Sequence, residues 1–265
     1  MKKYFLTYGD SSYKYSKIHL SYLAKQSGLF DEIISLGPND LSNEFKKNFQ
    51  EILNQKRGGG FWIWKHEIIS NLLDKIKPQD IILYCDAGSS INNSAKAKKR
   101  FKEYFDIILS RETSFLRFEA EKKYLEKFYT TKEVFEKLEV PENSKIRQTT
   151  QLQAGVMFFK KNNVSDLFFN DYKNLLKKDV NLITDNYKSS QILGFKDCRH
   201  DQSIFSVLAK QYDSYILDNE TEFKFRTNDQ FKFPILTVRA ANHGIKDKIK
   251  LTIFKKYYAK KTKFF

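Results

Sequence analysis

Residues 81–88 read IILYCDAG, so that Asp86 follows an apolar run directly. The segment 80–84 lies between Pro78 and Gly88, which is typical of a strand buried on both faces. Further strands are expected at 3–8, 32–36, 113–118 and 152–159, with weaker candidates at 215–217 and 223–225. Helices are expected between them, at about 11–28, 41–53, 61–76, 95–109, 121–128, 132–138, 164–177 and 203–212. This alternation predicts an α/β layer fold with a largely parallel central sheet.

The composition indicates one large globular domain with a sizeable core. The chain has 265 residues, of which 41% are hydrophobic and 15% aromatic. Only Cys85 and Cys198 are present, which excludes a disulfide framework and a four-thiolate zinc site. No run of about 18 apolar residues occurs, and the first residues lack the pattern of a signal peptide. A cytoplasmic location is therefore expected.

The net charge of +15 is concentrated at the C-terminal end. Residues 236–265 hold nine basic residues and one acid, so we divide the chain into a domain at 1–235 and a tail at 236–265. Ile245, Ile249, Ile253 and Tyr257 recur in the tail at four-residue spacing among eight lysines. The pattern suits a basic amphipathic helix on the anionic inner face of the cell membrane, or a solvated helix that packs on the domain.

Asp86 is the strongest candidate for a functional carboxylate. In open α/β sheets, ligands bind at the carboxyl ends of the strands, where Asp86 is expected. The alternative is a structural aspartate that caps the following turn through its side chain.

The segment 57–65, RGGGFWIWK, places three glycines before a predicted helix, between Arg57 and Lys65. Such a loop exposes backbone N–H groups at the positive end of a helix dipole, so a diphosphate can approach closely. The alternative for Trp62 and Trp64 is core packing. Two positions apart on one helix they cannot share a face, so at least one is expected to face a loop or a ligand.

Two later segments combine polar side chains with apolar surroundings. Gly155, in the strand 152–159, indicates a close approach to the backbone, with a bulge or a tight helix contact as alternatives. The run from Arg199 to Ser203 precedes an apolar helix and holds His200, Asp201 and Gln202; Asp201 or Ser203 as a simple N-cap is the alternative.

These motifs together resemble a family. A Thr-Tyr-Gly strand end, RGGGFWxWK, YxDAG, QAGVM and HDQS, in this order over residues 3–217, resemble bacterial and viral nucleotide-sugar-dependent glycosyltransferases of capsule, lipopolysaccharide and other surface glycans. The resemblance implies a GT-A fold, a single Rossmann-like α/β domain. It also implies a nucleotide-sugar donor, expected to be a UDP-sugar, and a glycan or lipid-linked acceptor.

The resemblance carries over to individual residues. Donor-binding residues would be Arg57, Gly59, Gly60, Trp62, Lys65, Asp86, Ala87, Gly88, Gln153, Ala154 and Gly155. His200 and Asp201 would be catalytic, and His200 and Gln202 would contact the acceptor. Asp86 and His243 would bind Mn²⁺ or Mg²⁺, although Gly88 replaces the second acid of the Asp-x-Asp signature and a histidine in this position is more often structural.

Sugar transfer explains why these residue types are needed. The leaving diphosphate gains negative charge while the anomeric carbon becomes oxocarbenium-like, so cations and N–H groups must meet that charge. In an inverting reaction Asp201 would accept the proton of the acceptor hydroxyl; in a retaining reaction it would shape the sugar pocket. Two other hypotheses stay open: a basic module that binds nucleic acid through the tail, and an inactive glycosyltransferase-like protein, which Gly88 suggests. For the glycosyltransferase that we favour, we expect no nucleic-acid partner.

Overall fold

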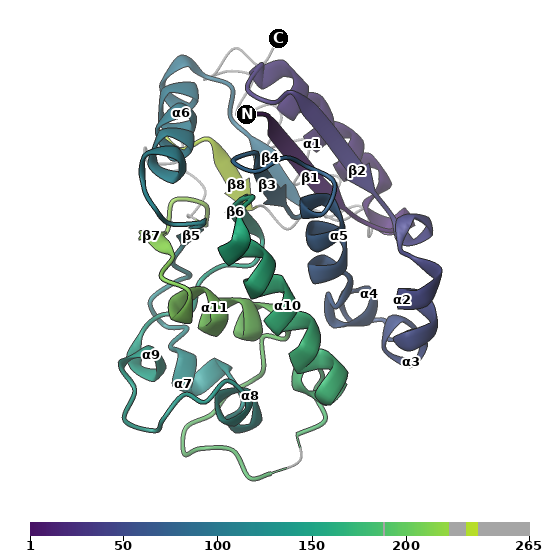
Figure 1. Ribbon diagram of the computed structural model, residues 1–265, viewed down its shortest axis with the longest axis vertical. Coiled ribbons are helices and arrows are strands. Elements are labelled where there is room, and N and C mark those ends of the chain that lie inside the picture. The colour runs from purple at the N-terminus through teal and green to yellow at the C-terminus, as the bar shows by residue number, and fades with distance from the viewer. Residues whose placement is uncertain (188, 223–231, 238–265) are drawn as a thin grey trace, which may run out of the picture.

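The computed structural model describes residues 1–187, 189–222 and 232–237 (Figure 1). Its strands are β1 Lys3–Tyr8, β2 Glu32–Leu36, β3 Ile81–Cys85, β4 Ser89–Ile91, β5 Phe115–Phe118, β6 Val156–Lys160, β7 Tyr215–Leu217 and β8 Ile235–Thr237. Its α-helices are α1 Lys14–Ser27, α2 Asn43–Asn48, α3 Gln50–Leu53, α4 Gly58–Phe61, α5 Trp64–Leu73, α6 Ala95–Ser110, α7 Glu126–Tyr129, α8 Lys132–Lys137, α9 Lys145–Gln148, α10 Asn163–Lys178 and α11 Asp201–Gln211. The 3-10 helices are η1 Ser11–Tyr13, η2 Pro38–Asp40 and η3 Val180–Ile183.

The central sheet has six strands in the order β2-β1-β3-β6-β5-β7. β6 runs antiparallel to both of its neighbours, and every other neighbouring pair is parallel. β4 and β8 form a separate antiparallel pair. The predicted α/β class with a mostly parallel sheet is therefore confirmed.

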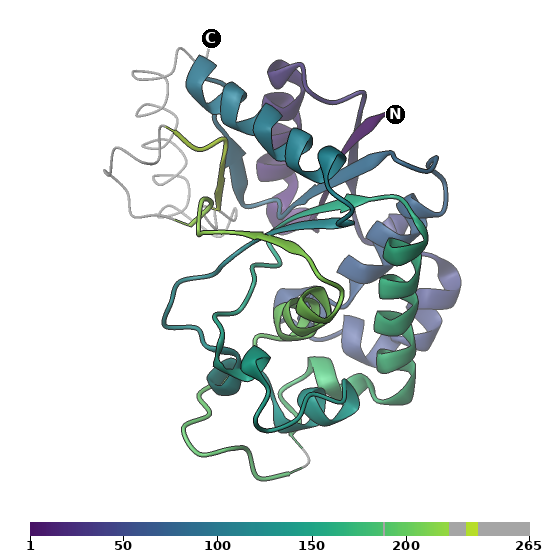
Figure 2. The ribbon, with the colours of Figure 1, turned by 60° about the vertical axis from the view of Figure 1, so that its left-hand side comes forward.

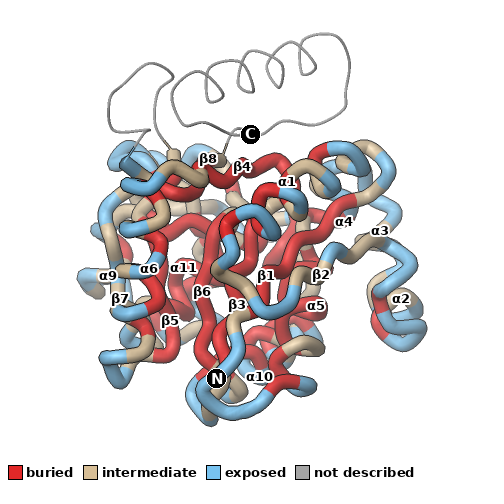
Figure 3. The backbone as a smooth tube through the Cα atoms, turned by 90° about the horizontal axis from the view of Figure 1, so that it is seen from above, coloured by how far each residue is buried: buried red, intermediate tan, exposed pale blue. Residues whose placement is uncertain are grey.

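Helices cover both faces of the sheet, as Figure 2 shows for α6 on one side and α10 and α11 on the other. The alternation of side chains along each strand divides the core between these faces. Phe5, Leu83 and Phe158 point toward α1 and α6. Leu6 and Tyr84 point toward α5, α10 and α11. β3 is buried over its whole length, as predicted (Figure 3). It lies inside the sheet, between β1 and β6, and its side chains enter the hydrophobic core on both faces of the sheet.

Several predicted elements differ in extent from the observed ones. The predicted helix at 41–53 is broken at Phe49, whose φ of −120° is not helical, and becomes α2 and α3. The helix predicted at 121–128 is reduced to α7, and the strand predicted at 152–159 to β6. Residues 152–155 leave the ladder because Leu152 forms only an isolated bridge with Glu119. These boundaries depend on neighbours in space, which local patterns do not contain.

The C-terminal predictions are only partly covered by the structure. The strand predicted at 223–225, the amphipathic tail helix and His243 lie outside the described residues. The proposed boundary after residue 235 falls inside β8, where Ile235 and Leu236 are buried. β4 and β8 were not predicted; each is three residues long and is paired with the other, a contact between segments that are far apart in the sequence.

Five consecutive residues with positive φ precede α5. The φ values are 61° for Gly58, 58° for Gly59, 93° for Gly60, 53° for Phe61 and 59° for Trp62. The helix predicted at 61–76 therefore starts only at Trp64, after this left-handed turn. Left-handed conformation costs a residue with a Cβ about 1–2 kcal/mol, so the turn is a strained feature that its surroundings maintain.

The two glycines at the centre of the turn provide a matched test of this packing. In Gly60→Ala the new Cβ would lie 2.8 Å from Cα of Leu53 and 2.9 Å from the carbonyl oxygen of Ile52. In Gly59→Ala the nearest atom would be Nε1 of Trp64, at 3.8 Å. We expect a loss of unfolding free energy of about 3 kcal/mol for Gly60→Ala and about 1 kcal/mol for Gly59→Ala, measured by urea unfolding. Equal losses would show that backbone contact with α3 does not constrain the turn.

Candidate active site

A pocket of about 1050 Å³ opens at the carboxyl edge of β1 and β3. All five of the sequence motifs contribute to its lining. The predicted site residues that line it are Arg57, Gly59, Trp62, Lys65, Asp86, Ala87, Gly88, Gln153, Ala154, Gly155, His200, Asp201 and Gln202. Gly60 is not part of the lining; it packs against α3. The predicted residues therefore come together at one site, although they lie far apart in the sequence.

Lys65 is the centre of the site's charged groups. Its ammonium lies 2.7 Å from Oδ2 of Asp201 and 3.2 Å from Oδ1 of Asp86, and it donates a hydrogen bond of 3.0 Å to the carbonyl oxygen of Ala154. Its side chain is only 2% exposed. Burial lowers the pKa of Lys65, but the two carboxylates outweigh burial and raise it above its usual value. Lys65 thus serves these carboxylates and does not extend into the pocket as a free cation.

Asp86 presents a carboxylate to the pocket. Its Oδ1 accepts a hydrogen bond of 2.6 Å from the hydroxyl of Tyr84 as well as the contact from Lys65. The side chain remains 38% exposed. The turn after Asp86 is closed by its backbone carbonyl, which accepts from the N–H of Ser89. The turn does not use the carboxylate, and this disfavours the alternative of a turn-capping aspartate.

Gly155 explains how the carboxylate of Asp86 fits beside the sheet. A Cβ on Gly155 would lie 3.0 Å from Oδ2 of Asp86 and 3.6 Å from Cγ2 of Thr237. The backbone N–H of Asp86 also donates to the carbonyl oxygen of Gly155, at 2.8 Å. The close approach that the glycine indicated is therefore confirmed, and the approaching group is the carboxylate itself.

Asp201 is almost completely buried at the start of α11. His200 occupies the N-cap position and makes no side-chain cap, so the N-cap alternative for Asp201 or Ser203 is wrong. Burial raises the pKa of Asp201 to about 6, while the contact with Lys65 opposes the increase. The carboxyl group therefore changes its charge close to neutral pH.

His200 is held rigidly beside the glycine-rich turn. Its φ is 52°, and its Nδ1 lies 2.9 Å from the carbonyl oxygen of Ile183. The ring packs 4.9 Å from Phe61 and 5.6 Å from Trp62, centroid to centroid. Its Nε2 has no hydrogen-bond partner and lies 3.8 Å from Asp185. Burial lowers the pKa of His200, so the ring is neutral at pH 7.

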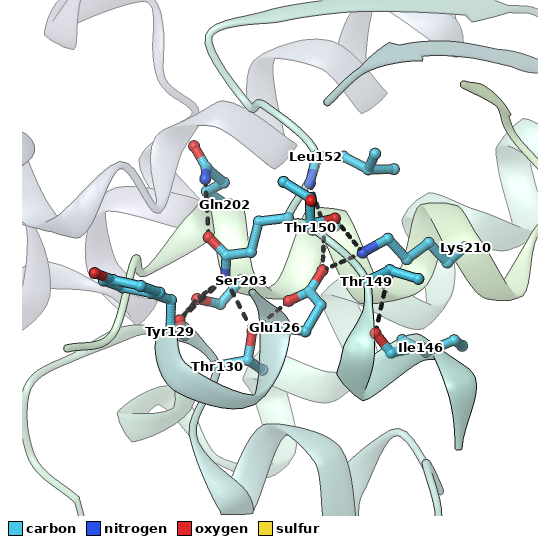
Figure 4. A network of polar contacts seen from close by, with 12 residues as sticks. Glu126, Tyr129, Thr130, Ile146, Thr149, Thr150, Leu152, Gln202, Ser203 and Lys210 are labelled. Atoms are coloured by element: carbon cyan, nitrogen blue, oxygen red, sulfur yellow. Dashed lines mark hydrogen bonds and ion pairs between the residues drawn. The ribbon is translucent and has the colours of Figure 1, made fainter. Parts of the chain in front are cut away.

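Gln202 is positioned by a buried polar network (Figure 4). Its Nε2 donates a hydrogen bond of 2.9 Å to Oε1 of Gln151. The Nε2 of Gln151 in turn donates hydrogen bonds to Oγ1 of Thr130 and to the carbonyl oxygen of Tyr129. Beneath Gln151, the buried Glu126 accepts from Thr130. These bonds fix the orientation of the Gln202 amide. Its Nε2 is used by the network, and its Oε1 is not. Gln151, two residues before Gln153, was not among the predicted site residues.

Gln153 lines the pocket, but its amide is used within the protein. Its Nε2 donates a hydrogen bond of 2.8 Å to the carbonyl oxygen of Glu119 and another of 2.9 Å to Oδ1 of Asn219. Its Oε1 accepts from the hydroxyl of Thr221. The side chain is buried, so the predicted contact between Gln153 and the donor sugar would require these bonds to break.

Arg57 spans the mouth of the pocket. Its guanidinium lies 3.1 Å from Asp185 and 3.2 Å from Asp197, and all three side chains are about half exposed. The two carboxylates raise the pKa of Arg57 although burial lowers it. The cation predicted for the diphosphate is therefore already paired in the free protein.

The glycine-rich turn does not present the free N–H groups that its sequence suggested. The N–H groups of residues 59–63 donate to the carbonyl oxygens of Lys56, Gln55, Arg57, Gly58 and Gly60. This expectation was wrong because the left-handed turn closes on itself. Trp62 and Trp64 both line the pocket; Trp64 also stacks on Tyr8, with ring centroids 3.9 Å apart.

The carboxyl end of β1 contributes residues that were not among the predicted site residues, although Tyr8 and Gly9 belong to the Thr-Tyr-Gly motif. Tyr8, Gly9, Asp10, Ser12 and Tyr13 all line the pocket. A signal was present, since parallel neighbouring strands bring their carboxyl ends to the same edge of a sheet. Lys46, Lys56 and Arg199 add positive charge to the lining.

The described residues do not fit a divalent metal by themselves. Within residues 1–187, 189–222 and 232–237, no group of three His, Cys, Asp or Glu side chains could hold an ion. Asp86 offers one carboxylate, and one of its oxygens is already bonded by Lys65 and Tyr84. His243 lies outside these residues. No reaction step is therefore assigned to a metal.

No protein-family model matches the chain, and no curated protein sequence matches it. Among solved structures, a glycosyltransferase involved in the glycosylation of the major capsid of PBCV-1 is 11% identical, covering 97% of this chain and 100% of that one, with a TM-score of 0.47. Mouse xyloside xylosyltransferase 1 is 8% identical, covering 82% and 85%, with a TM-score of 0.45. The galactosyltransferase LgtC is 11% identical, covering 82% and 72%, with a TM-score of 0.38. All three are glycosyltransferases by their descriptions.

No helix among the described residues is long and apolar enough to cross a bilayer.

The burial of Asp201 predicts a pH dependence of stability. Because its folded pKa is raised from 3.8 to about 6, the group stabilises the fold most below about pH 4 and loses this contribution as the pH rises through about 6. The unfolding free energy of the native chain minus that of Asp201→Asn should fall by up to about 3 kcal/mol between pH 4 and 7. Denaturant unfolding of both chains at each pH measures this difference in unfolding free energy. A difference that stays flat with pH for Asp201→Asn would contradict the assignment.

Proposed function

We propose that this chain is a GT-A glycosyltransferase that transfers a sugar from a nucleotide-diphosphate donor, a UDP-sugar, to a surface polysaccharide or lipid-linked glycan. The observation that carries the proposal is the convergence of Arg57, Lys65, Asp86, Asp201 and Gln202 on one pocket at the carboxyl edge of the sheet. This edge is where α/β sheets bind nucleotides. A pocket of about 1050 Å³ is large enough for a nucleotide sugar.

The charges of the lining suit a leaving diphosphate. Lys46, Lys56, Arg57 and Arg199 line the pocket, and their charge would stabilise the negative charge that develops as the anomeric bond breaks. Lys65 offsets one of the two negative charges of Asp86 and Asp201, so the two acids repel the diphosphate less than they would without it. The exposed part of Asp86 would accept hydrogen bonds from the donor.

The two carboxylates have different environments and hence different proposed roles. Asp201 is 6% exposed, and Lys65 covers its Oδ2. This supports a role in shaping the sugar pocket over a role as the base that deprotonates the acceptor. The free oxygen of Gln202 would accept a hydrogen bond from a sugar hydroxyl. A divalent cation held by Asp86 and His243 stays a prediction.

Nucleotide binding and turnover test the proposal together. Calorimetric titration with UDP, with and without Mn²⁺ or EDTA, should show binding to the full chain. Asp86→Ala should lower the release of UDP from a panel of UDP-sugars at least about 100-fold, because the carboxylate faces the donor. Asp106→Ala, at an exposed acid on α6, serves as the control with unchanged turnover.

Three outcomes would decide against parts of this proposal. No heat with any nucleoside diphosphate would remove the enzyme assignment. Unchanged turnover in Asp86→Ala would make Asp86 a structural residue. Nucleotide binding without hydrolysis or transfer of any donor sugar would favour an inactive glycosyltransferase-like protein.

The ion pairs of Arg57 predict a gain of affinity on removing acids. Asp185→Asn combined with Asp197→Asn should bind UDP about 3–10-fold more tightly, because Arg57 would no longer be neutralised at the pocket mouth. Arg57→Gln should bind about 10-fold more weakly. Lys178→Gln, exposed at the end of α10, should leave the dissociation constant unchanged in the same calorimetric assay. Weaker binding in the double variant would contradict this view of Arg57.

A further inference from the structure

The outer face of α1 carries a stripe of exposed apolar side chains. Tyr15, Ile18 and Tyr22 are 67%, 58% and 47% exposed and follow one another at spacings of three and four residues, so they lie on one side of the helix. The opposite side packs Leu20 and Leu23 into the core beneath the sheet. The stripe is therefore a surface feature that folding of the domain does not bury.

The charged residues of α1 and of the first turn of α6 are all basic. α1 contains Lys14, Lys17 and Lys25 and no acidic residue in its 14 positions. α6 begins with the sequence AKAKKR and likewise has no acid in its first turn. Cations near a helix N-terminus face the positive end of its dipole, which is unfavourable for the helix. Basic residues at both helix starts therefore indicate attraction to a negatively charged surface.

α1 and α6 lie next to each other on the same face of the sheet. Asn93, just before α6, donates a hydrogen bond of 3.0 Å to the carbonyl oxygen of Leu23. Lys98 donates one of 3.3 Å to the carbonyl oxygen of Gln26. Both helices pack into one core cluster. We call the resulting surface the α1–α6 face; its exposed residues include Lys14, Tyr15, Ile18, Tyr22, Lys25, Lys96, Lys99 and Lys102, and further along α6 the acid Asp106 is exposed as well.

The α1–α6 face adjoins the mouth of the pocket. Ser12 and Tyr13 line the pocket and directly precede α1 in the chain. A ligand presented at this surface would therefore be close to the nucleotide-sugar site. The aliphatic Ile18 lies between the two tyrosines of the stripe and can enter the headgroup region of a bilayer.

We propose that the α1–α6 face docks on a bilayer that contains anionic lipids, with Tyr15, Ile18 and Tyr22 inserted and the surrounding lysines on the headgroups. Only the idea that the pocket then receives a lipid-linked acceptor rests on the proposed function. Docking itself requires neither donor binding nor turnover.

Co-sedimentation of the full chain with vesicles tests the docking. Vesicles of phosphatidylglycerol mixed with phosphatidylcholine should bind the protein more tightly than phosphatidylcholine alone, and less tightly at high salt. The combined Tyr15→Ser, Ile18→Ser and Tyr22→Ser variant should lose at least about tenfold in partition coefficient, because burying even one such side chain changes an equilibrium by about one order of magnitude. Lys14→Gln with Lys25→Gln should lose about 3–10-fold.

Matched variants on the opposite side of the sheet serve as controls. Val164→Ser with Leu167→Ser removes exposed apolar residues from α10, and Lys177→Gln with Lys178→Gln removes exposed lysines. Both should partition like the native chain, and all variants should unfold at the same midpoint.

Four outcomes would overturn the proposal. The first is that the protein does not bind anionic vesicles, and the second is that the combined Tyr15→Ser, Ile18→Ser and Tyr22→Ser variant binds them as well as the native chain does. The third is that this variant changes its oligomeric state. The fourth is that duplex DNA displaces the protein from vesicles while this variant still binds DNA normally. Titration with UDP, done separately, reports on the proposed function alone.

Discussion

The pairing of one buried ammonium with two carboxylates is the interaction on which the site depends. Lys65 comes from α5, Asp86 from the end of β3 and Asp201 from the start of α11, and Lys65 also bonds the backbone at Ala154. A single cation thus joins segments that are remote in sequence. Removing one partner of such a buried pair is far more costly than the pair is worth, because it leaves an uncompensated charge. The pair therefore specifies the relative positions of these segments more than it adds stability.

The left-handed turn before α5 is what brings Lys65 to this position. Its five residues of positive φ reverse the chain between α3 and α5, and Gly60 contacts the backbone of α3 in a space that no Cβ would fit. Phe61 and Trp62 adopt the same strained conformation and pack against His200. Strain of this kind is found where the surroundings require it. Here it links the glycine-rich segment to the start of α11 across the pocket.

Some of the site could be predicted because the signal was local. The apolar run before Asp86 predicted a central buried strand with an acid at its carboxyl end, and both features are observed. Gly155 predicted a close approach. By contrast, the glycine-rich loop was expected to offer free N–H groups, but the turn uses them internally. Arg57 and Gln153 line the pocket as expected, yet both are bonded to other parts of the protein. A sequence pattern identifies a polar group but not its partner.

The sequence by itself determined the alternation of strands and helices, the mostly parallel sheet and the side chains that reach its carboxyl edge, because periodicity and strand ends are properties of neighbouring residues. Only the tertiary structure decided which charges are paired, that Lys65 lies between Asp86 and Asp201, that Gln151 orients Gln202, and that β4 pairs with β8. These are contacts between residues far apart in the chain. Their strength depends on distance and burial, which exist only once the layers of the fold have packed together.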